Sequence, residues 1–261
     1  MKIDFYKYQG TGNDFVILDN RKGKLNNLTM AQVRLMCDRR FGIGADGLML
    51  LNNHTHYDFE MKYFNADGRE SSMCGNGGRC LVKFAQDMGI MRTNYSFLAI
   101  DGPHEANINM DGIVSLKMKD VKTIRKFHND FILDTGSPHY IKMVNHLDKL
   151  DVFSLGKMIR NNTRYSKEGI NVNFVEHVNE DEISVRTYER GVEDETLSCG
   201  TGVTAAALAC YHNENGFNDV IVHTRGGKLN VEYDRIGDNS YKNIWLSGPA
   251  EKVFEGEIEL D

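Results

Sequence analysis

The chain of 261 residues contains only three prolines, one tryptophan and five cysteines. An odd number of cysteines without framework spacing argues against a set of structural disulfides and favours free thiols in a reducing compartment. The first ten residues, MKIDFYKYQG, include no apolar segment of the kind found in signal peptides. We therefore expect a cytoplasmic protein.

The sequence also lacks a lysine- or arginine-rich block, and no apolar run approaches the roughly 20 residues that a membrane-spanning helix needs. The formal net charge is −6. We therefore expect neither nucleic acid nor a membrane as a partner. With 41% hydrophobic and 26% charged residues, the composition is that of an ordinary globular protein with one or two domains.

Two cysteines occur in near-copies of one motif, SMCGNGGRC at 72–80 and SCGTGVTAAALAC at 198–210. Cys74 and Cys199 hold the same place, and each Cys-Gly-x-Gly leads into a run typical of a helix. The first turn of a helix leaves N–H groups unpaired, which favours a thiolate and can hold a carboxylate. The sequence therefore predicts one activated thiol and one anion-binding turn in each half of the chain.

The two motifs belong to a longer internal repeat. TGN at 11–13 matches TGS at 135–137, and Gly102 matches Gly227, at nearly the same offset as the two cysteines. KYFNADG and RTYERGV, the segments before each motif, match as well. The repeat predicts a mixed α/β (α+β) protein of two similar, pseudo-symmetric domains, 1–119 and 120–249, with a linker near 120–130. Each domain is expected to be a sheet wrapped around a central helix, with the active site in the cleft between them.

Local patterns predict the elements around these motifs. Thr29 and Gln32 form a capping box that opens a helix reaching about Arg40, and the helix after Cys74 should stop near Gly89. GIGADG at 42–47 matches a dinucleotide-binding pattern, but a helix precedes it and a strand follows, which is the wrong order for that function. Strands are expected at 15–19, LMLL after GIGADG, 58–64, 94–100, 104–110 and 112–118.

The other cysteines and histidines carry less signal. We interpret Cys37, Cys80 and Cys210 as buried, unreactive thiols. His54 and His56 lie in a polar loop without zinc-site spacing, so no metal site is expected. His139 differs because its loop matches the Asn13 loop of the first half.

Two thiols on opposite faces of one carbon would suit proton transfer. One removes the proton beside a carboxylate, and the other returns a proton to the opposite face. The negative charge of the intermediate is stabilised where helix N-termini hold the carboxylate. This chemistry needs neither a cofactor nor a metal. A hydrolase with Cys74 as nucleophile and His139 as base, or a catalytically silent binding protein, remains as an alternative.

Taken together, several motifs resemble the diaminopimelate epimerase family: TGNDF, GIGADG, FNADG with CGNGGR, INVNF, and YERG followed by SCGTG. The resemblance extends from residue 5 to residue 256. It implies the two-domain epimerase fold, with residues 250–261 returning to complete the first domain, and a homodimer. It also implies cofactor-independent conversion of LL- to meso-diaminopimelate in lysine and peptidoglycan precursor synthesis. A proline or hydroxyproline racemase-type epimerase is the nearest alternative.

The resemblance assigns roles to particular residues. Cys74 is implied to be the proton donor and Cys199 the proton acceptor for the LL isomer, with His139 and Glu189 tuning the thiols. Arg190 is implied to bind the distal carboxylate, since its planar fork accepts two oxygens. The remaining substrate-binding residues implied by the motifs are Asn13, Asn65, Gly75, Asn76, Asn171, Glu189, Gly200 and Thr201.

The chain departs from the family pattern at two places. Ser137 stands where asparagine is frequent before Pro-His, which replaces an amide by a shorter hydroxyl. Gly47 stands where some members have glutamine, and it offers no side-chain contact. Both departures bear on the details of substrate contacts. Arg190, together with Asn65 and Asn171, argues against the proline-type alternative, because a pyrrolidine ring has no second charged head.

Overall fold

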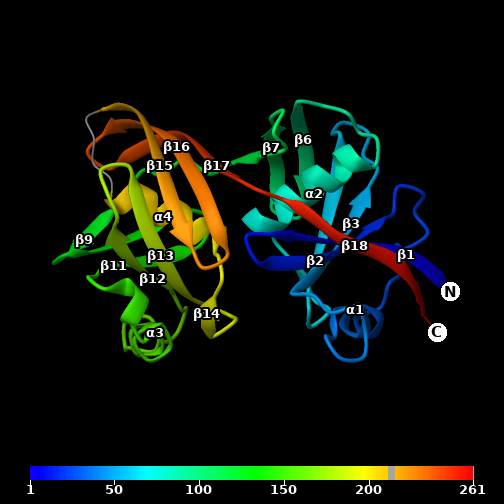
Figure 1. The fold of residues 1–261 in the computed structure, drawn as a ribbon, viewed down its shortest axis with the longest axis horizontal. Helices are drawn as coiled ribbons and strands as arrows, with labels where there is room; N and C mark the ends of the chain where they lie inside the picture. Colours follow the sequence, from blue (N-terminus) through cyan, green and yellow to red (C-terminus); the bar gives the residue numbers. More distant parts are fainter. Residues whose placement is uncertain (211–214, 261) are drawn as a thin grey trace. The chain divides into compact units, whose positions relative to one another are not determined.

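The computed structural model describes residues 1–210 and 215–260, and the chain divides into two compact units (Figure 1). One unit consists of Met1–Leu116 together with Gly248–Asp261, and the other of Lys117–Ser247. We call them the N-terminal and the C-terminal unit. No helix among the described residues is long and apolar enough to cross a membrane.

The N-terminal unit is a mixed sheet with two helices. Its strand order is β18-β1-β2-β3-β4-β6-β7-β8, with the short β5 also paired to β4. The pairs β2–β3 and β4–β6 are parallel, and each is joined by a crossover that contains a helix. The elements are β1 (Lys2–Gly10), β2 (Asn13–Asp19), α1 (Met30–Cys37), β3 (Gly47–Asn52), β4 (Phe59–Asn65), β5 (Glu70–Ser71), α2 (Gly75–Asp87), β6 (Asn94–Ala99), β7 (Gly102–Ile108), β8 (Val114–Lys117) and β18 (Glu251–Glu259).

The C-terminal unit repeats this plan. Its strand order is β9-β10-β11-β12-β13-β15-β16-β17, β14 pairs with β13, and the parallel pairs are again those with a helical crossover. The elements are β9 (Arg125–Phe127), β10 (Asp130–Asp134), β11 (Pro138–Met143), a 3₁₀ turn (Leu147–Lys149), α3 (Val152–Arg160), β12 (Asn171–His177), β13 (Glu182–Glu189), β14 (Asp194–Thr196), α4 (Gly200–Cys210), β15 (Gly216–Thr224), β16 (Gly227–Gly237) and β17 (Ser240–Gly248).

The predicted mixed α/β fold is therefore confirmed, and the two units share one strand order with helices in the same two crossovers. The capping box at Thr29 and Gln32 is present, and GIGADG lies between α1 and β3 as expected. Two details were wrong. Helix α1 ends at Cys37 rather than Arg40, because the Asp38 carboxylate binds the backbone N–H groups of Arg40 and Phe41 and turns the chain. The expected linker at 120–130 contains strand β9.

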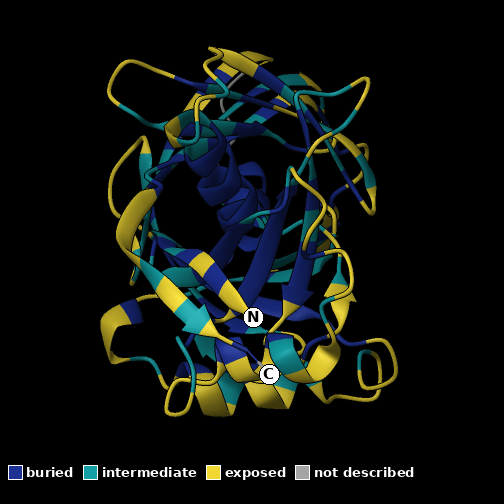
Figure 2. Cartoon of the chain, turned by 90° about the vertical axis from the view of Figure 1, so that its right-hand side faces the viewer, coloured by how far each residue is buried: buried dark blue, intermediate teal, exposed yellow. Residues whose placement is uncertain are grey.

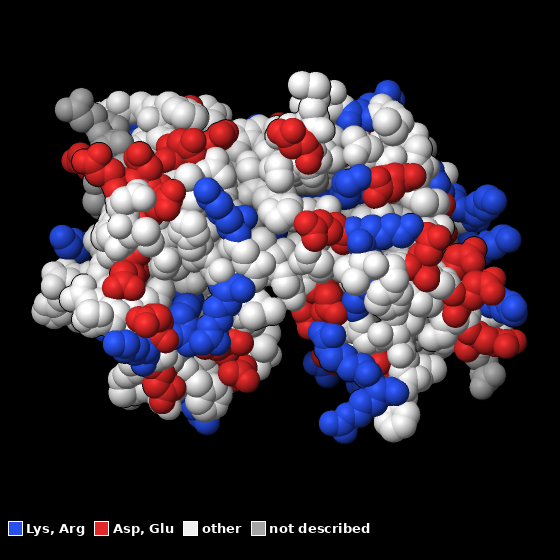
Figure 3. All heavy atoms as spheres, in the orientation of Figure 1, with Lys and Arg blue, Asp and Glu red and all other residues white. Residues whose placement is uncertain are grey.

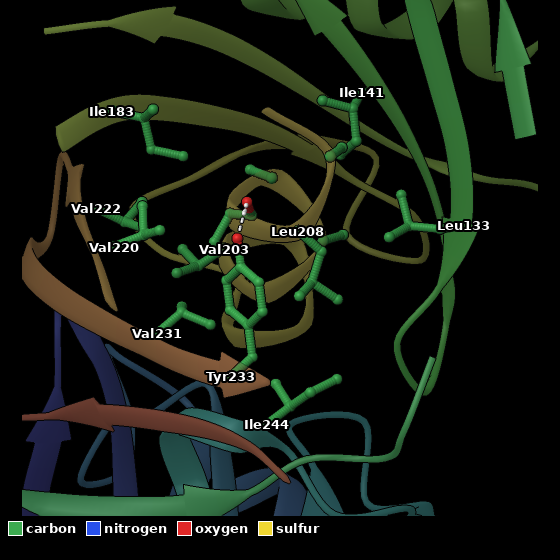
Figure 4. Close-up of a cluster of buried hydrophobic side chains, with 14 of the residues drawn as sticks. Leu133, Ile141, Ile183, Val203, Leu208, Val220, Val222, Val231, Tyr233 and Ile244 are labelled. Carbon is green, nitrogen blue, oxygen red and sulfur yellow. Dashed lines mark hydrogen bonds between the residues drawn. The ribbon is translucent and has the colours of Figure 1, made fainter. Parts of the chain in front are cut away.

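One helix in each unit is buried along most of its length. In Figure 2 the buried positions gather in the interior, while exposed positions follow the outer strands and loops. Helix α4 is rich in alanine, and Val203 to Ala209 are all fully buried. Figure 4 shows valine, leucine and isoleucine side chains of the surrounding strands directed at this helix. The Tyr233 hydroxyl donates to the Ala207 carbonyl (3.5 Å). Small side chains let the strands approach the helix from all sides.

Close packing also explains several glycines. A Cβ at Gly77 in α2 would lie 3.2 Å from Met49 Sδ, and one at Gly78 would lie 2.9 Å from Leu116 Cδ1. At Gly47, which opens β3, a Cβ would lie 2.5 Å from Tyr63 Cε2 and 2.7 Å from the Phe64 carbonyl oxygen. Hence no side chain fits at Gly47 with these neighbours in place.

We expect Gly47→Ala to lower the free energy of unfolding by about 1–3 kcal/mol, because overpacking displaces Tyr63 or the β4 backbone. Urea unfolding of the variant and the parent protein measures this difference. Gly237→Ala is the matched control, since its Cβ would meet nothing closer than Ser240 Cβ at 4.0 Å. Equal destabilisation by the two substitutions would contradict the packing explanation.

Candidate active site

Cys74 occupies the N-cap position of α2. Its backbone is extended, and its carbonyl accepts the N–H of Gly78 (2.7 Å), the first bond of the helix. Within the described part of the chain, the thiol makes no capping bond to the helix backbone and instead donates to Asn13 Oδ1 (3.6 Å). Gly75 and Asn76 are buried in the first turn. The thiol thus points toward the β1–β2 turn.

Asn13 connects Cys74 to the GIGADG loop. Its Oδ1 also accepts from Asn76 Nδ2 (3.3 Å), and its own Nδ2 donates to Asp46 Oδ2 (2.6 Å). The structure therefore joins Cys74, Asn13 and Asn76, three of the predicted residues. Asp46, which the sequence reasoning did not single out, fixes the orientation of the Asn13 amide.

Asp46 belongs to an ionic cluster at the base of this loop. Asp14 pairs with the nearly buried Lys7 (2.6 Å) and with Arg39 (2.6 Å), and Arg39 also binds Asp46 (2.7 Å). Although burial raises it, hydrogen bonds from Arg39 and Lys7 hold the pKa of Asp14 below its usual range. Two carboxylates and two cations together leave the cluster neutral.

Asn65 lies at the end of β4, exposed, and its register partner is Gly47. Its backbone N–H donates to the Arg69 carbonyl (3.0 Å). Among the described hydrogen bonds, none joins its side chain to Cys74 or Asn13. The structure thus leaves Asn65 at the rim of this half-site.

Cys199 begins α4 in the same manner. It is buried, and its carbonyl accepts the N–H of Val203 (2.8 Å). Its sulfur lies 3.5 Å from Thr201 Oγ1. Gly200 and Thr201 form the first helical turn, as predicted. The pairing of a cysteine with a helix start is therefore present in both units.

His139 stands behind Thr201 and is fully buried. Its Nε2 lies 3.0 Å from Thr201 Oγ1 and 3.0 Å from Ser137 Oγ, and its Nδ1 lies 3.0 Å from Asn173 Nδ2. Thr187 donates to Asn173 Oδ1 (2.8 Å), so the Asn173 amide nitrogen faces the ring. Nδ1 is then the acceptor, and Nε2 carries the proton of the neutral ring. The Thr201 hydroxyl can accept from Nε2 and donate to Cys199.

Burial, helped by the charge of Arg190, lowers the pKa of His139 to about 3. The ring is therefore neutral at physiological pH. In this state His139 orients the Thr201 hydroxyl rather than acting as a charged partner of the thiol. Asn173, which fixes the ring, was not among the predicted residues. This contact could not be predicted from the sequence, because His139 and Asn173 are 34 residues apart and only the parallel β11–β12 pairing brings them together.

The other predicted residues of the C-terminal unit meet at the ends of β12 and β13. Asn171 donates to Ser137 Oγ (3.1 Å) and accepts the backbone N–H of Arg190 (2.9 Å). The Arg190 side chain is exposed and donates to the Glu168 carbonyl (3.2 Å). Glu189 accepts from Thr196 (2.9 Å). The hydroxyl of Ser137 thus has three partners, His139, Thr201 and Asn171, where the family motif often has an amide.

Glycine in the second motif is required by this network. A Cβ at Gly202 would lie 2.3 Å from Asn173 Oδ1 and 3.3 Å from His139 Cε1. Glycine at a helix start allows a tight turn and the close approach of a ligand to the backbone. At Gly202, as at Gly77, the structure adds the close approach of side chains from the sheet.

The remaining three cysteines were expected to be buried, and two of them are. Cys37 and Cys80 are buried, and Cys210 is half-buried at the end of α4. Burial raises the pKa of all three thiols to about 12.

Solved structures with the same fold come from several groups of proteins. A phenazine biosynthesis protein of the PhzF family from Bacillus anthracis matches with a TM-score of 0.77 and 16% identity, covering 100% of both chains. A hydroxyproline epimerase from Agrobacterium vitis matches with a TM-score of 0.71 and 13% identity, covering 100% of this chain and 93% of that one. At such low identity the matches show the fold. It is a fold that PhzF-family proteins and proline racemase-type proteins share.

Sequence comparison gives the family. The family model for diaminopimelate epimerase matches residues 5–124 and 131–253. Diaminopimelate epimerase of Flavobacterium psychrophilum is 49% identical over 98% of this chain and 100% of its own length. The enzyme of Chlorobaculum tepidum is 46% identical over 96% and 99%. The chain belongs to the diaminopimelate epimerase family, and it is an isomerase.

The buried neutral His139 predicts a pH-dependent stability. Between its ordinary pKa of 6.5 and about 3, the unfolded chain binds a proton that the folded protein does not. The stabilising contribution is therefore complete above pH 6.5 and is lost as the pH falls toward 3, at up to about 1.4 kcal/mol per pH unit.

We expect the free energy of unfolding to fall less steeply below pH 6.5 in His139→Gln than in the parent protein. Urea titrations at pH 7.0, 6.0 and 5.0 measure the slopes. His177→Gln, which changes an exposed histidine at the end of β12, serves as the control. If the free energy of unfolding falls with pH at the same slope in the parent protein and in His139→Gln, then His139 binds protons equally in the folded and unfolded states, which would contradict this prediction.

Proposed function

We propose that this chain interconverts LL- and meso-diaminopimelate by moving a proton at one α-carbon between the thiols of Cys74 and Cys199. The observation that carries the proposal is the pair of helix starts, each placed directly after a cysteine in a matched unit. Membership in the diaminopimelate epimerase family supports the substrate. The reaction requires no cofactor.

The proton balance is simple. With the LL isomer, the thiolate of Cys199 takes the proton of the α-carbon, and the electron pair of the C–H bond moves onto the carbon and its carboxylate. The thiol of Cys74 then donates its proton to the opposite face. Cys199 ends as thiol and Cys74 as thiolate, which is the state needed for the reverse reaction.

The first helical turns stabilise the charge of the intermediate. Gly75 and Asn76 in α2, and Gly200 and Thr201 in α4, supply N–H groups that a carboxylate can accept from. Because the negative charge of the carbanion extends onto that carboxylate, these donors bind the transition state more strongly than the substrate. Asn13 and the His139–Thr201 pair hold the donors and thiols in place.

Recognition of the far end of the substrate is the second requirement for specificity. Arg190 is held by its backbone N–H bond to Asn171, its guanidinium is exposed, and a planar fork suits a carboxylate. Asn65 provides a further polar group for that end, and the Glu189 carboxylate can accept from an ammonium group of the substrate. We assign Glu189, which is bonded to Thr196, a second role beside the thiols together with His139. This set is suited to a substrate with two charged heads.

The alternatives receive less support. A hydrolase using Cys74 with His139 needs a free ring nitrogen on the histidine, but both nitrogens are engaged by residues of the C-terminal unit. The proline-type alternative is represented by a hydroxyproline epimerase that shares the fold at 13% identity. A silent binding protein would not need both cysteines.

We further infer a homodimer in the cytoplasm that serves lysine and peptidoglycan precursor synthesis. The family resemblance supports the dimer and the pathway, and the five free cysteines of the described chain agree with a reducing compartment. Acidic and basic side chains are interspersed on the face shown in Figure 3, without a patch of one sign that would favour nucleic acid.

The decisive experiment follows deuterium incorporation into LL-diaminopimelate in heavy water. Cys74→Ala and Cys199→Ala should each lower the rate of epimerisation by at least about 100-fold, because each removes the acid or the base of one face. Cys37→Ala, at a buried cysteine in α1, should retain activity. Full turnover by either of the first two variants would refute the two-thiol mechanism, and a covalent adduct on Cys74 would favour the hydrolase.

Arg190→Ala should weaken kcat/KM for diaminopimelate by a factor that corresponds to about 2–5 kcal/mol, because a charge-assisted bidentate contact is lost. Arg190→Lys should recover only part of it. Arg164→Ala, at another exposed arginine of the same unit, is the control. Unchanged kinetics in Arg190→Ala would mean that this side chain does not contact the substrate.

A further inference from the structure

A buried arginine lies one helical turn beyond the N-terminal thiol. Arg79 in α2 is fully buried, although it carries a guanidinium that stays charged in proteins. Its Nη1 donates to the Gly75 carbonyl (3.4 Å), and its Nη2 donates to Asn76 Oδ1 (3.0 Å) and Thr11 Oγ1 (3.2 Å). All three partners are neutral.

No carboxylate among the described residues pairs with this charge, and the Nε atom has no hydrogen-bond partner there. A buried cation without a counterion is costly, so proteins rarely retain one for packing alone. Burial lowers the pKa of Arg79, while the thiolate forms of Cys80 and Cys74 raise it. By reciprocity, the Arg79 charge favours a thiolate at either position.

The repeat provides an internal comparison. The position five residues after Cys74 is Arg79, and the position five residues after Cys199 is Thr204. Thr204 is also fully buried, and its hydroxyl donates to the Gly200 carbonyl (3.0 Å), the counterpart of the Arg79 bond to Gly75. A neutral side chain thus suffices for the helix at this position. The charge of Arg79 is an addition that the fold does not require.

The other charged groups near Cys74 do not cancel this charge. Asp101 accepts the backbone N–H of Met73 (3.3 Å) and faces His104 (3.2 Å), but Asp101 is exposed, so solvent screens its charge more than that of the buried Arg79. Asp46 reaches Asn13 from the GIGADG loop, but Lys7, Asp14, Arg39 and Asp46 together form a neutral cluster. The pKa of Cys80 is raised by burial to about 12, so Cys80 stays a thiol.

In the C-terminal unit, the Cys199 sulfur lies 3.5 Å from the Thr201 hydroxyl, and the neutral ring of His139 stands behind that hydroxyl. The exposed guanidinium of Arg190 also acts on that ring and helps to lower its pKa.

We propose that Arg79 is a positioning residue that holds the negative charge of the free protein on Cys74 rather than on Cys199. The positive charge of Arg79, which no carboxylate of the described residues pairs with, stabilises the thiolate. Its bonds to Asn76 and Gly75 also hold the first turn of α2 in the conformation that can bind an anionic ligand. The inference rests on the proposed two-thiol function for its use in catalysis. The free protein then begins with Cys74 as base, the state in which it takes up the meso isomer.

The test measures each thiol separately in the whole protein, without substrate. Folded protein is treated with the neutral reagent iodoacetamide from pH 5.5 to 9.5, and the carbamidomethylation rates of Cys74 and Cys199 are read by peptide mass mapping. Each rate is scaled to its value at high pH, so differences in accessibility cancel and the midpoint reports the thiol pKa.

Arg79→Met and Arg79→Gln remove the charge, and Gln retains a polar donor for the Gly75 carbonyl. Both should lower the scaled rate of Cys74 at pH 7 by about tenfold, since a nearby opposite charge shifts a thiol pKa by a unit or more. Cys199 in the same sample should not change. Arg79→Lys keeps the charge and should stay near the parent rate. Arg92→Met, at an exposed arginine of the same unit, is the control.

A folded Arg79→Met or Arg79→Gln protein with an unchanged Cys74 profile overturns the proposal, as does an equal shift at both cysteines. If neither neutral variant folds, the parent protein still decides, because a Cys199 midpoint below that of Cys74 contradicts the inference and the reverse order supports it. The alkylation needs no diaminopimelate. Failure of epimerisation with the expected midpoints would therefore refute the proposed function and leave the role of Arg79 intact.

Discussion

The burial of most of one helix inside each sheet is the constraint on which the rest of the structure depends. Helices α2 and α4 are covered by strands on several sides, so their polar backbone ends are the only parts left for chemistry. Close packing demands glycine and alanine along both helices. It also places the N-terminal N–H groups, which no preceding turn can satisfy, next to the residue that caps the helix. In both units that residue is a cysteine.

The two units solve the same geometric problem with different electrostatics. The N-terminal half-site joins its thiol to amides, Asn13 and Asn76, in front of a buried guanidinium. The C-terminal half-site uses hydroxyls, Thr201 and Ser137, in front of a neutral imidazole. Register explains the exchange: His139 pairs with Asn171 across a parallel pair, where the first unit has Phe15 beside Gly47. The two units therefore share their backbone fold and differ in the polar side chains around the thiol.

The sequence alone predicted much of this because repeats and helix starts are local signals. Several strands of the first half, the likeness of the two halves, the cysteines at the helix starts and the capping box of α1 all follow from spacing and residue type. Contacts between segments far apart in the sequence could not be predicted: Asp46 with Asn13, Asn173 with His139, and Thr11 with Arg79 are 33, 34 and 68 positions apart. The early end of α1 depended on a side-chain turn at Asp38, which competes with the helix for backbone N–H groups.

Strand β18 gives the chain a particular order of completion during synthesis. Lys2 of β1 pairs with Glu259 of β18, so β1 and β18 are neighbours in one sheet although the whole C-terminal unit lies between them in the sequence. The C-terminal unit is one continuous segment, and its last strand, β17, ends at Gly248, before β18 is translated. The N-terminal unit must wait, with one edge of β1 unpaired, until the residues of β18 leave the ribosome. The half that is translated first is therefore the half that is finished last.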